Sequence, residues 1–197
     1  MELLYQFTNL EQIMYDDNHI GVCFLGSEGS QKLDVDNSAF QKWLYETIYR
    51  LVEAEYCTRF IFRAINDFEV ACLKMILGQV LLDDKIIKKV RNLDGVDFLL
   101  IVADDGTVEQ SQDIDSGKSR IDAILPRQLK YPLSITPYSV AGGQRDKICE
   151  MIDLSNHIVC CLPADGTADN RFYYEYVKAA GIDVSNWTEQ SLTVTPG

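Results

Sequence analysis

Short apolar runs alternate with helical patterns along most of this chain, and that alternation limits its fold more than any other feature. The clearest unit contains the apolar run 158–162, a polar turn at Gly166, an amphipathic segment over 170–180 and a closing Gly181. Glycine is common just beyond a helix C-terminus. Apolar strands that alternate with helices predict a mostly parallel sheet with helices on both faces, which is an α/β, Rossmann-like three-layer fold.

The same periodicity predicts the other elements of the fold. The predicted strands are residues 20–25, 59–64, 98–103, 131–135, 157–162 and a short edge strand at 182–184. The predicted helices are residues 38–56, 67–90 with a break at Gly78, 120–125, 144–154 and 170–180. Asp36 or Asn37 is expected to cap the first helix, and Asn66 or Asp67 the second. A polar loop is expected at 104–118 and a glycine-containing loop at 138–143.

With 197 residues, the chain suits a single domain over 1–197, in which 1–18 form an N-terminal extension.

Composition excludes several classes of protein. The net charge of −12 opposes binding to nucleic acid, whose phosphates favour a basic surface. The sequence has no run of about 18 apolar residues, as a membrane span would require, and no signal-peptide pattern. Five of the six cysteines lie in apolar segments, where thiols behave as small hydrophobic groups. The two histidines and the lack of paired cysteines disfavour zinc. We therefore expect a reduced, cytoplasmic protein without a metal centre.

Polar turns that follow the strands provide the candidate ligand-binding residues. The carboxyl ends of parallel strands share one edge of the sheet, where helix N-termini favour anions. We expect Gly26, Asn66 and Gly166 to meet at this edge. The candidate ligand-binding residues are Gly26, Ser27, Asn66, Arg145, Asp165, Gly166, Thr167 and Asn170. Each turn has an ordinary structural alternative, a strand-to-helix loop closed by a capping side chain.

Two carboxylates are the candidates for catalysis. Asp67 and Glu69 follow the second predicted strand, where a pair of acids serves acid–base chemistry or binds ribose hydroxyls. Acidic residues in the first turn of a helix also complement the helix dipole generically. Both interpretations stay open from the sequence, and no residue is assigned to catalysis with certainty.

Several motifs resemble those of the SLOG superfamily, and most closely its YpsA-like branch, over about residues 20–186. Residues 151–156 parallel a Met-Val-Asp-x-Ser-Asp motif, 165–167 a Gly-Gly-Thr turn and 176–181 the helix that follows. The resemblance implies a Rossmann-like sheet and a nucleotide-type ligand at the strand ends. In the LOG enzymes of this superfamily, a related glycine-rich loop supports cleavage of a nucleotide's N-glycosidic bond.

Departures from these motifs favour binding over catalysis. Gly26-Ser27-Glu28 stands where Gly-His-Arg is usual, and Asp165 replaces a glycine. No glutamate follows Thr167 at the LOG position. The leading hypothesis is therefore a small protein that senses or sequesters a nucleotide or an ADP-ribose-like ligand, without a resident cofactor. The alternatives are an N-glycosidase-like enzyme and a ligand-free interaction module. Homo-oligomers are a further expectation.

Overall fold

The computed structural model describes residues 20–27, 33–63, 66–93, 95–103, 119, 122–124, 131, 133–163 and 167–188. Six strands of this part form one sheet in the order β4-β3-β2-β1-β5-β6, and each neighbouring pair is parallel. The strands are β1 (Ile20–Gly26), β2 (Cys57–Phe62), β3 (Val96–Ala103), β4 (Leu133–Val140), β5 (His157–Cys161) and β6 (Asp183–Asn186). The expected α/β fold is confirmed, and the described strands are all parallel rather than mostly so.

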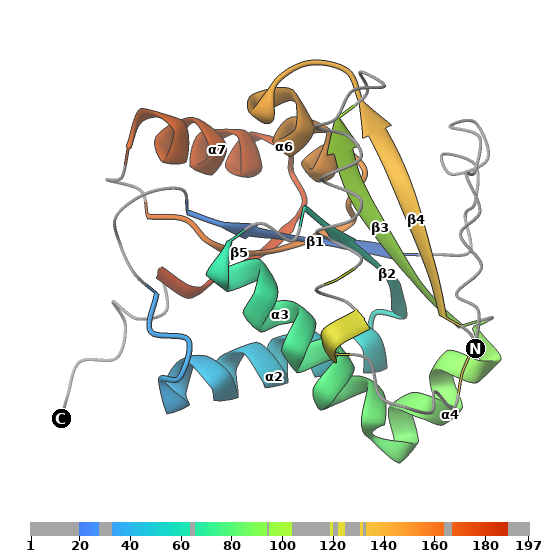
Figure 1. The fold of residues 1–197 in the computed structure, drawn as a ribbon. Coiled ribbons are helices and arrows are strands. Elements are labelled where there is room, and N and C mark those ends of the chain that lie inside the picture. The colour runs from blue at the N-terminus through green and yellow to red at the C-terminus, as the bar shows by residue number, and fades with distance from the viewer. Residues whose placement is uncertain are drawn as a thin grey trace, which may run out of the picture.

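Helices cover both faces of the sheet (Figure 1). One face carries α2 (Ser38–Glu53), α3 (Asp67–Gly78), the 3-10 turn η1 (Val80–Leu82) and α4 (Asp84–Asn92). The opposite face carries α6 (Gln144–Asp153) and α7 (Ala168–Ala179). These helices and the sheet make the three predicted layers. The predicted break at Gly78 is confirmed, since α3 ends there and α4 is a separate helix.

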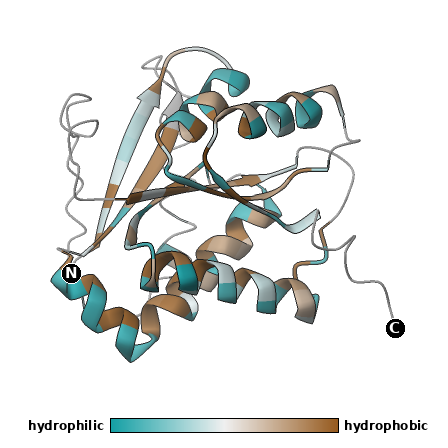
Figure 2. Ribbon diagram, turned by 180° about the vertical axis from the view of Figure 1, so that it is seen from behind, coloured by the Kyte–Doolittle hydropathy of each residue, from teal (hydrophilic) through white to brown (hydrophobic). Residues whose placement is uncertain are grey.

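The strands are apolar on both sides because both sides are covered. Along β1, Val22 and Phe24 belong to the core on the α2 and α3 side, whereas Cys23 and Leu25 belong to the core beneath α6 and α7. This alternation follows from the two-residue period of a strand. Phe24 stacks on Phe62 of β2 with ring centroids 4.6 Å apart. Figure 2 shows the result as largely hydrophobic strands between helices that alternate hydrophobic and hydrophilic residues.

Side chains cap the N-termini of four described helices, namely α2, α3, α4 and α7. Asn37 accepts hydrogen bonds from the backbone N–H groups of residues 39 and 40, at 2.9 and 3.1 Å. Asn66 caps α3 by accepting from the backbone of Glu69 at 2.9 Å. Asp83 caps α4 in the same way. Of the two residues proposed for each of the first two caps, asparagine is the one used.

The helix predicted over 38–56 is too long, because α2 ends at Glu53. Tyr56 adopts a φ of 60°, a left-handed conformation that no α-helix contains. The next strand, β2, begins directly after Tyr56 and covers 57–62 instead of the predicted 59–64.

The fourth strand covers 133–140 instead of the predicted 131–135, so it begins later and ends later, and the expected loop at 138–143 is wrong for its first three residues. The part of the strand that was not predicted contains Thr136, Pro137 and Ser139, so it lacks the apolar pattern of a buried strand. The hydroxyls of Ser134 and Thr136 donate to Asp97 of β3 at 2.8 and 3.2 Å, and Arg59 of β2 donates to the same carboxylate at 2.9 Å. Pro137 is tolerated because β4 lies at one end of the described sheet, where a strand needs hydrogen bonds on one side only.

Some predicted segments lie outside the described residues, namely the N-terminal extension at 1–18 and the loop at 104–118. Of the helix predicted over 120–125, only residues 122–124 are described, and they are helical. The last strand, β6, begins at Asp183, one residue later than predicted.

Candidate ligand site at the strand ends

The order in which the chain adds strands to the sheet reverses between β1 and β5. From β1 the chain adds β2, β3 and β4 on one side, and it then crosses to the other side of β1 to form β5 and β6. Gly26 at the end of β1 lies in register with Cys161 at the end of β5, and the backbone N–H of Ser27 donates to the Cys161 carbonyl at 3.1 Å. In open α/β sheets, ligands bind in the crevice outside the strand ends at such a switch point.

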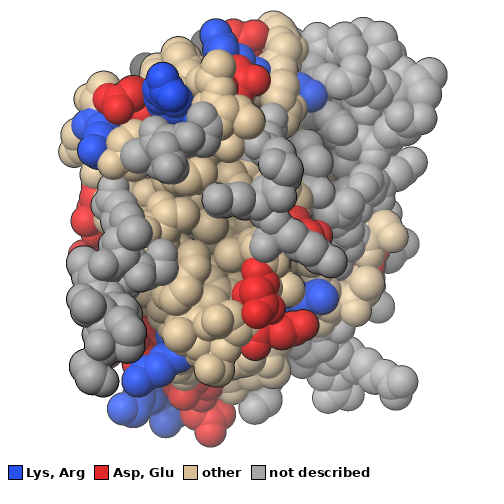
Figure 3. Space-filling view, turned by 90° about the vertical axis from the view of Figure 1, so that its left-hand side faces the viewer, with Lys and Arg blue, Asp and Glu red and all other residues tan. Residues whose placement is uncertain are grey.

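Figure 3 faces the side of the molecule on which β1 and β5 end. Among the described residues in this view, uncharged atoms occupy most of the centre. Lysine, arginine, aspartate and glutamate side chains gather at the upper and lower margins and in a further, mainly acidic group just below the centre.

Gly26 and Asn66, both predicted site residues, are in contact. A Cβ built on Gly26 would lie 2.7 Å from Cγ of Asn66, closer than real side chains approach one another. The glycine is required here because the Asn66 side chain packs directly against the backbone of β1. The expectation that the ends of β1 and β2 meet at one edge is confirmed for these two residues.

Asn66 also belongs to a buried polar network at the start of α3. Its side-chain nitrogen donates to Oε1 of Glu69 at 3.1 Å. Arg63, which follows β2, donates to the same oxygen through Nε at 3.3 Å and through Nη2 at 2.9 Å. The side chains of Arg63 and Glu69 are 1% and 0% exposed. Glu69 therefore links Arg63, which follows β2, to Asn66 at the start of α3, whereas Asp67, the other catalytic candidate, is exposed.

Thr167 begins α7 at the same edge of the sheet. Its hydroxyl oxygen accepts a hydrogen bond from the backbone of Asn170 at 3.3 Å, so Thr167 acts as the helix cap. The hydroxyl hydrogen can still donate to a bound oxygen. The Asn170 side chain is buried. Asp165 and Gly166, two further predicted ligand-binding residues, lie outside the described residues.

Arg145 lies near the start of α7 but interacts with a carboxylate. It donates to Asp169 at 2.8 Å, and its guanidinium carbon is 4.3 Å from the centroid of the Phe172 ring. The hydrogen bond that Arg145 donates to Asp169 raises the pKa of Arg145. Arg145 and Asp169 are both about half exposed, at 55% and 56%. A phosphate near this guanidinium would compete with Asp169 for it.

The motif at 151–156, which carries much of the family resemblance, lies at the opposite edge of the sheet. Asn156 precedes β5, accepts from the backbone N–H of Gly21 at 2.8 Å, and donates its own N–H to the Gly21 carbonyl at 2.9 Å. The Ser155 hydroxyl donates to the Met151 carbonyl, and Asp153 accepts from the hydroxyl of Tyr176 at 3.0 Å. These residues join α6, β1 and α7, so their role in this chain is structural.

The cysteines are free thiols, and five of the six are buried. Burial raises the pKa of Cys23 to about 12, that of Cys57 to about 12 and that of Cys161 to about 11. These three thiols stay protonated near neutral pH and are poor nucleophiles, because the thiolate is the reactive form.

Two further features bear on the class of site. Within the described ranges, no three His, Cys, Asp or Glu side chains are grouped as metal ligands. No helix in the same ranges has the length and apolar character needed to cross a membrane.

The sequence predicted a glycine-containing loop before α6, but it did not predict the part played by Arg63 or the hydrogen bond between Gly143 and Asp146. Gly142 has a φ of 105°, and the N–H of Gly143 donates to Asp146 at 2.7 Å. The consecutive glycines followed by an acid three residues later were the available signal.

Comparisons with known proteins identify no relatives for this chain: no protein-family model matches, and the search of curated proteins finds no match.

Proposed function

We propose that this chain binds a nucleotide or a nucleotide-derived molecule in the crevice between the ends of β1 and β5, and that it acts as a sensor or sequestering protein. The observation that supports this most is the in-register ending of the two strands, with Gly26 beside Cys161 and Ser27 bonded across the junction. This is the switch point at which open α/β sheets hold their ligands.

The groups around the crevice suit the phosphate end of such a ligand. Ser27 and Thr167 offer hydroxyl groups, and Thr167 caps a helix whose N-terminal N–H groups favour an anion. Arg145 reaches the first turn of α7 through its bond to Asp169. In this proposal it turns from Asp169 toward a bound phosphate.

Binding without turnover is the function that these residues favour over N-glycosidase activity. An N-glycosidase needs a carboxylate placed to stabilise the developing ribosyl cation. Glu69 is fully buried and bonded to Arg63 and Asn66, which leaves Asp67 as the exposed acid of the pair. Incubation with AMP, followed by chromatography for free adenine, should show no product. Adenine release that disappears in Asp67→Asn would favour the enzyme instead.

The other elements of the proposal concern partners and location. A net charge of −12 opposes nucleic acid as a partner, and six free thiols suit the reducing conditions of the cytoplasm. We propose a cytoplasmic protein whose main partner is the small ligand, and whose assembly into homo-oligomers can be measured by light scattering. An interaction module without a ligand is the second candidate, supported by Glu28, which stands where the motif has arginine, and by Asp165, which replaces a glycine.

A matched pair of helix-cap variants tests the site. Thr167→Ala and Asp83→Ala each remove a side-chain cap, from α7 and α4 respectively, and each should cost about 1 kcal/mol of stability. Only Thr167→Ala should weaken binding of AMP or ADP-ribose, by about tenfold, or about 1.4 kcal/mol. Equal affinities of the two variants in calorimetry would exclude Thr167 from the site.

A further inference from the structure

A pocket lies between the segment before α2, the start of α2 and one side of α3. Its volume is about 360 Å³, within the range of about 300–1,000 Å³ that is usual for small-molecule sites. Its lining residues are Val35, Asp36, Gln41, Asp67, Val70, Ala71, Lys74, Met75 and Gln79. Asp67 alone among them was a candidate of the strand-end site.

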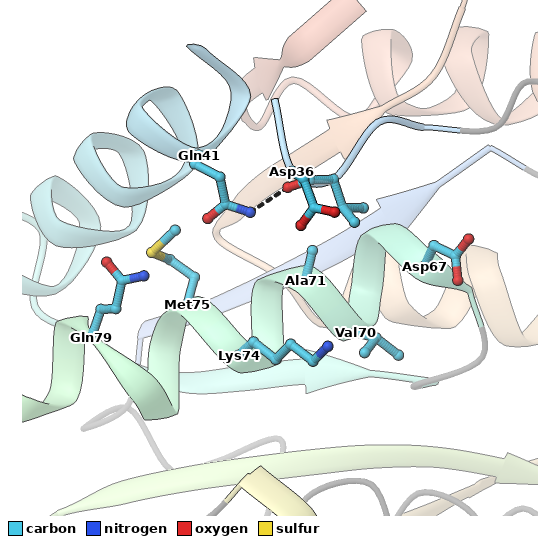
Figure 4. Close-up of a pocket in the computed structure, with 9 residues that line it drawn as sticks. Asp36, Gln41, Asp67, Val70, Ala71, Lys74, Met75 and Gln79 are labelled. Carbon is cyan, nitrogen blue, oxygen red and sulfur yellow. Dashed lines mark hydrogen bonds between the residues drawn. The ribbon is translucent and has the colours of Figure 1, made fainter. Parts of the chain in front are cut away.

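One stripe of α3 makes the floor of this pocket. Positions three and four residues apart lie on the same face of a helix, so the lining residues follow one another from Asp67 at one end to Gln79 at the other (Figure 4). Ala71 and Met75 in the middle of the stripe are 7% and 2% exposed. The floor is therefore apolar and already packed.

The opposite wall is held in place by its own hydrogen bond. The side-chain amide of Gln41 on α2 donates to the carbonyl oxygen of Val35, which ties the segment before α2 to its first turns (Figure 4). A wall that is fixed before binding lowers the entropic cost of holding a ligand.

Both signs of charge surround the pocket. Asp36 and Asp67 supply carboxylates, and Lys74 supplies an ammonium group. Among the residues that the structure describes, no ion pair joins any of these three side chains to another charged group. A simple cation would meet Lys74, and a simple anion would meet two carboxylates. A molecule that carries both charges satisfies all three.

We propose that this pocket binds a zwitterionic small molecule of the amino-acid class with a large apolar side chain. Asp36 and Asp67 receive the ammonium group, Lys74 receives the carboxylate, and the apolar side chain lies on Ala71 and Met75. This site is separate from the nucleotide site proposed above, and neither proposal depends on the other.

Calorimetry and thermal shift with L-methionine, L-phenylalanine and L-tryptophan test the proposal on the full chain. At least one should bind saturably with one-to-one stoichiometry. Its N-acetyl derivative and its carboxamide derivative should each bind at least about tenfold more weakly, because each removes one charge. No saturable binding of any of the three at millimolar concentration would overturn the proposal, as would derivatives that bind as tightly as the parent amino acid.

Three variants and one control locate the binding. Lys74→Met and Asp36→Asn should each weaken binding about tenfold or more, and Ala71→Leu should block the floor. Lys42→Met is the matched control, because Lys42 is an exposed lysine of α2 that pairs with Glu46 outside the pocket. Affinity that is unchanged in Lys74→Met and Asp36→Asn, both exposed positions at which the fold should persist, would contradict the assignment. Nucleotide affinity measured on the same variants should stay at its wild-type value.

Discussion

The side chain of Asn66 fills the space in which a side chain at residue 26 would lie. A Cβ on Gly26 would be 2.7 Å from Cγ of Asn66 and 2.8 Å from its Nδ2, while Asn66 is held by hydrogen bonds to both the backbone and the carboxylate of Glu69. The end of β1 and the start of α3 are thereby fixed against each other at the edge where we propose that the ligand binds.

Gly26→Ala should therefore destabilise the protein by about 1–3 kcal/mol, the usual cost of overpacking. Asn66→Ser keeps a capping side chain but is shorter. The double variant should be more stable than the sum of the two single losses predicts, because serine leaves room for the added methyl group. Urea unfolding of the four proteins measures this coupling. Strictly additive losses would show that the two side chains do not compete for space.

Replacement of either member of the buried pair formed by Arg63 and Glu69 should cost about 3–5 kcal/mol, because the remaining charge stays buried without this partner. Arg63→Met combined with Glu69→Met should be less damaging than the sum of the single changes. The measurement is again the free energy of unfolding in urea. A double variant as unstable as that sum would mean that other contacts, not this pair, hold the two side chains.

Stability should fall at alkaline pH because buried thiols resist ionisation. Burial raises the pKa of Cys23 to about 12 from its ordinary value of 9.0. Between these values the unfolded thiol loses its proton and the folded thiol keeps it, so unfolding releases a proton and its free energy decreases as pH rises. The contribution is fully present below about pH 9 and is lost progressively toward pH 12.

Cys23→Ala should make this decrease shallower by about 1.4 kcal/mol per pH unit over the interval. Cys149, which is only partly buried, provides the control: burial raises its pKa too, but Cys149→Ala should change the slope less. Urea unfolding at several pH values between 9 and 10.5 gives the slopes. Identical slopes for wild type and Cys23→Ala would refute this account of the thiol.

Asp169→Asn should strengthen nucleotide binding severalfold if Arg145 contacts the phosphate. The substitution removes an anion near the start of α7 and weakens the interaction that holds the guanidinium, now 2.8 Å from the carboxylate. Because the pair is exposed, its loss should change stability by less than about 1 kcal/mol. Isothermal titration with ADP measures the effect, and tighter binding that persists in Asp169→Asn combined with Arg145→Ala would assign it to the lost charge alone.

Much of the fold could be predicted because burial on both faces makes a strand such as β5 uniformly apolar, and because Asn37 and Asn66 mark helix starts. The full length of β4 was harder to predict, since its polar residues Ser134 and Thr136 donate hydrogen bonds to a carboxylate on the neighbouring strand. Such pairing depends on the order of strands in the sheet, which no local pattern contains.

The candidate site, too, could be predicted only in part. Gly26 and Asn66 could be placed together because strand ends share an edge, but the burial of Glu69 could not be predicted. It depends on the ion pair with the buried Arg63 guanidinium, which no local sequence pattern reveals. The pocket beside α3 was missed because its polar residues come from separate parts of the chain, namely the segment before α2, α2 itself and α3, and look like ordinary exposed positions.

The most direct test of the proposed function is calorimetric titration of the wild-type protein and Thr167→Ala with AMP, ADP and ADP-ribose, with Asp83→Ala as the control. We predict that at least one of the three ligands binds wild type and Asp83→Ala with equal affinity and binds Thr167→Ala about tenfold more weakly. No saturable binding of any of them, or equal affinity for all three proteins, would contradict a nucleotide site between the ends of β1 and β5.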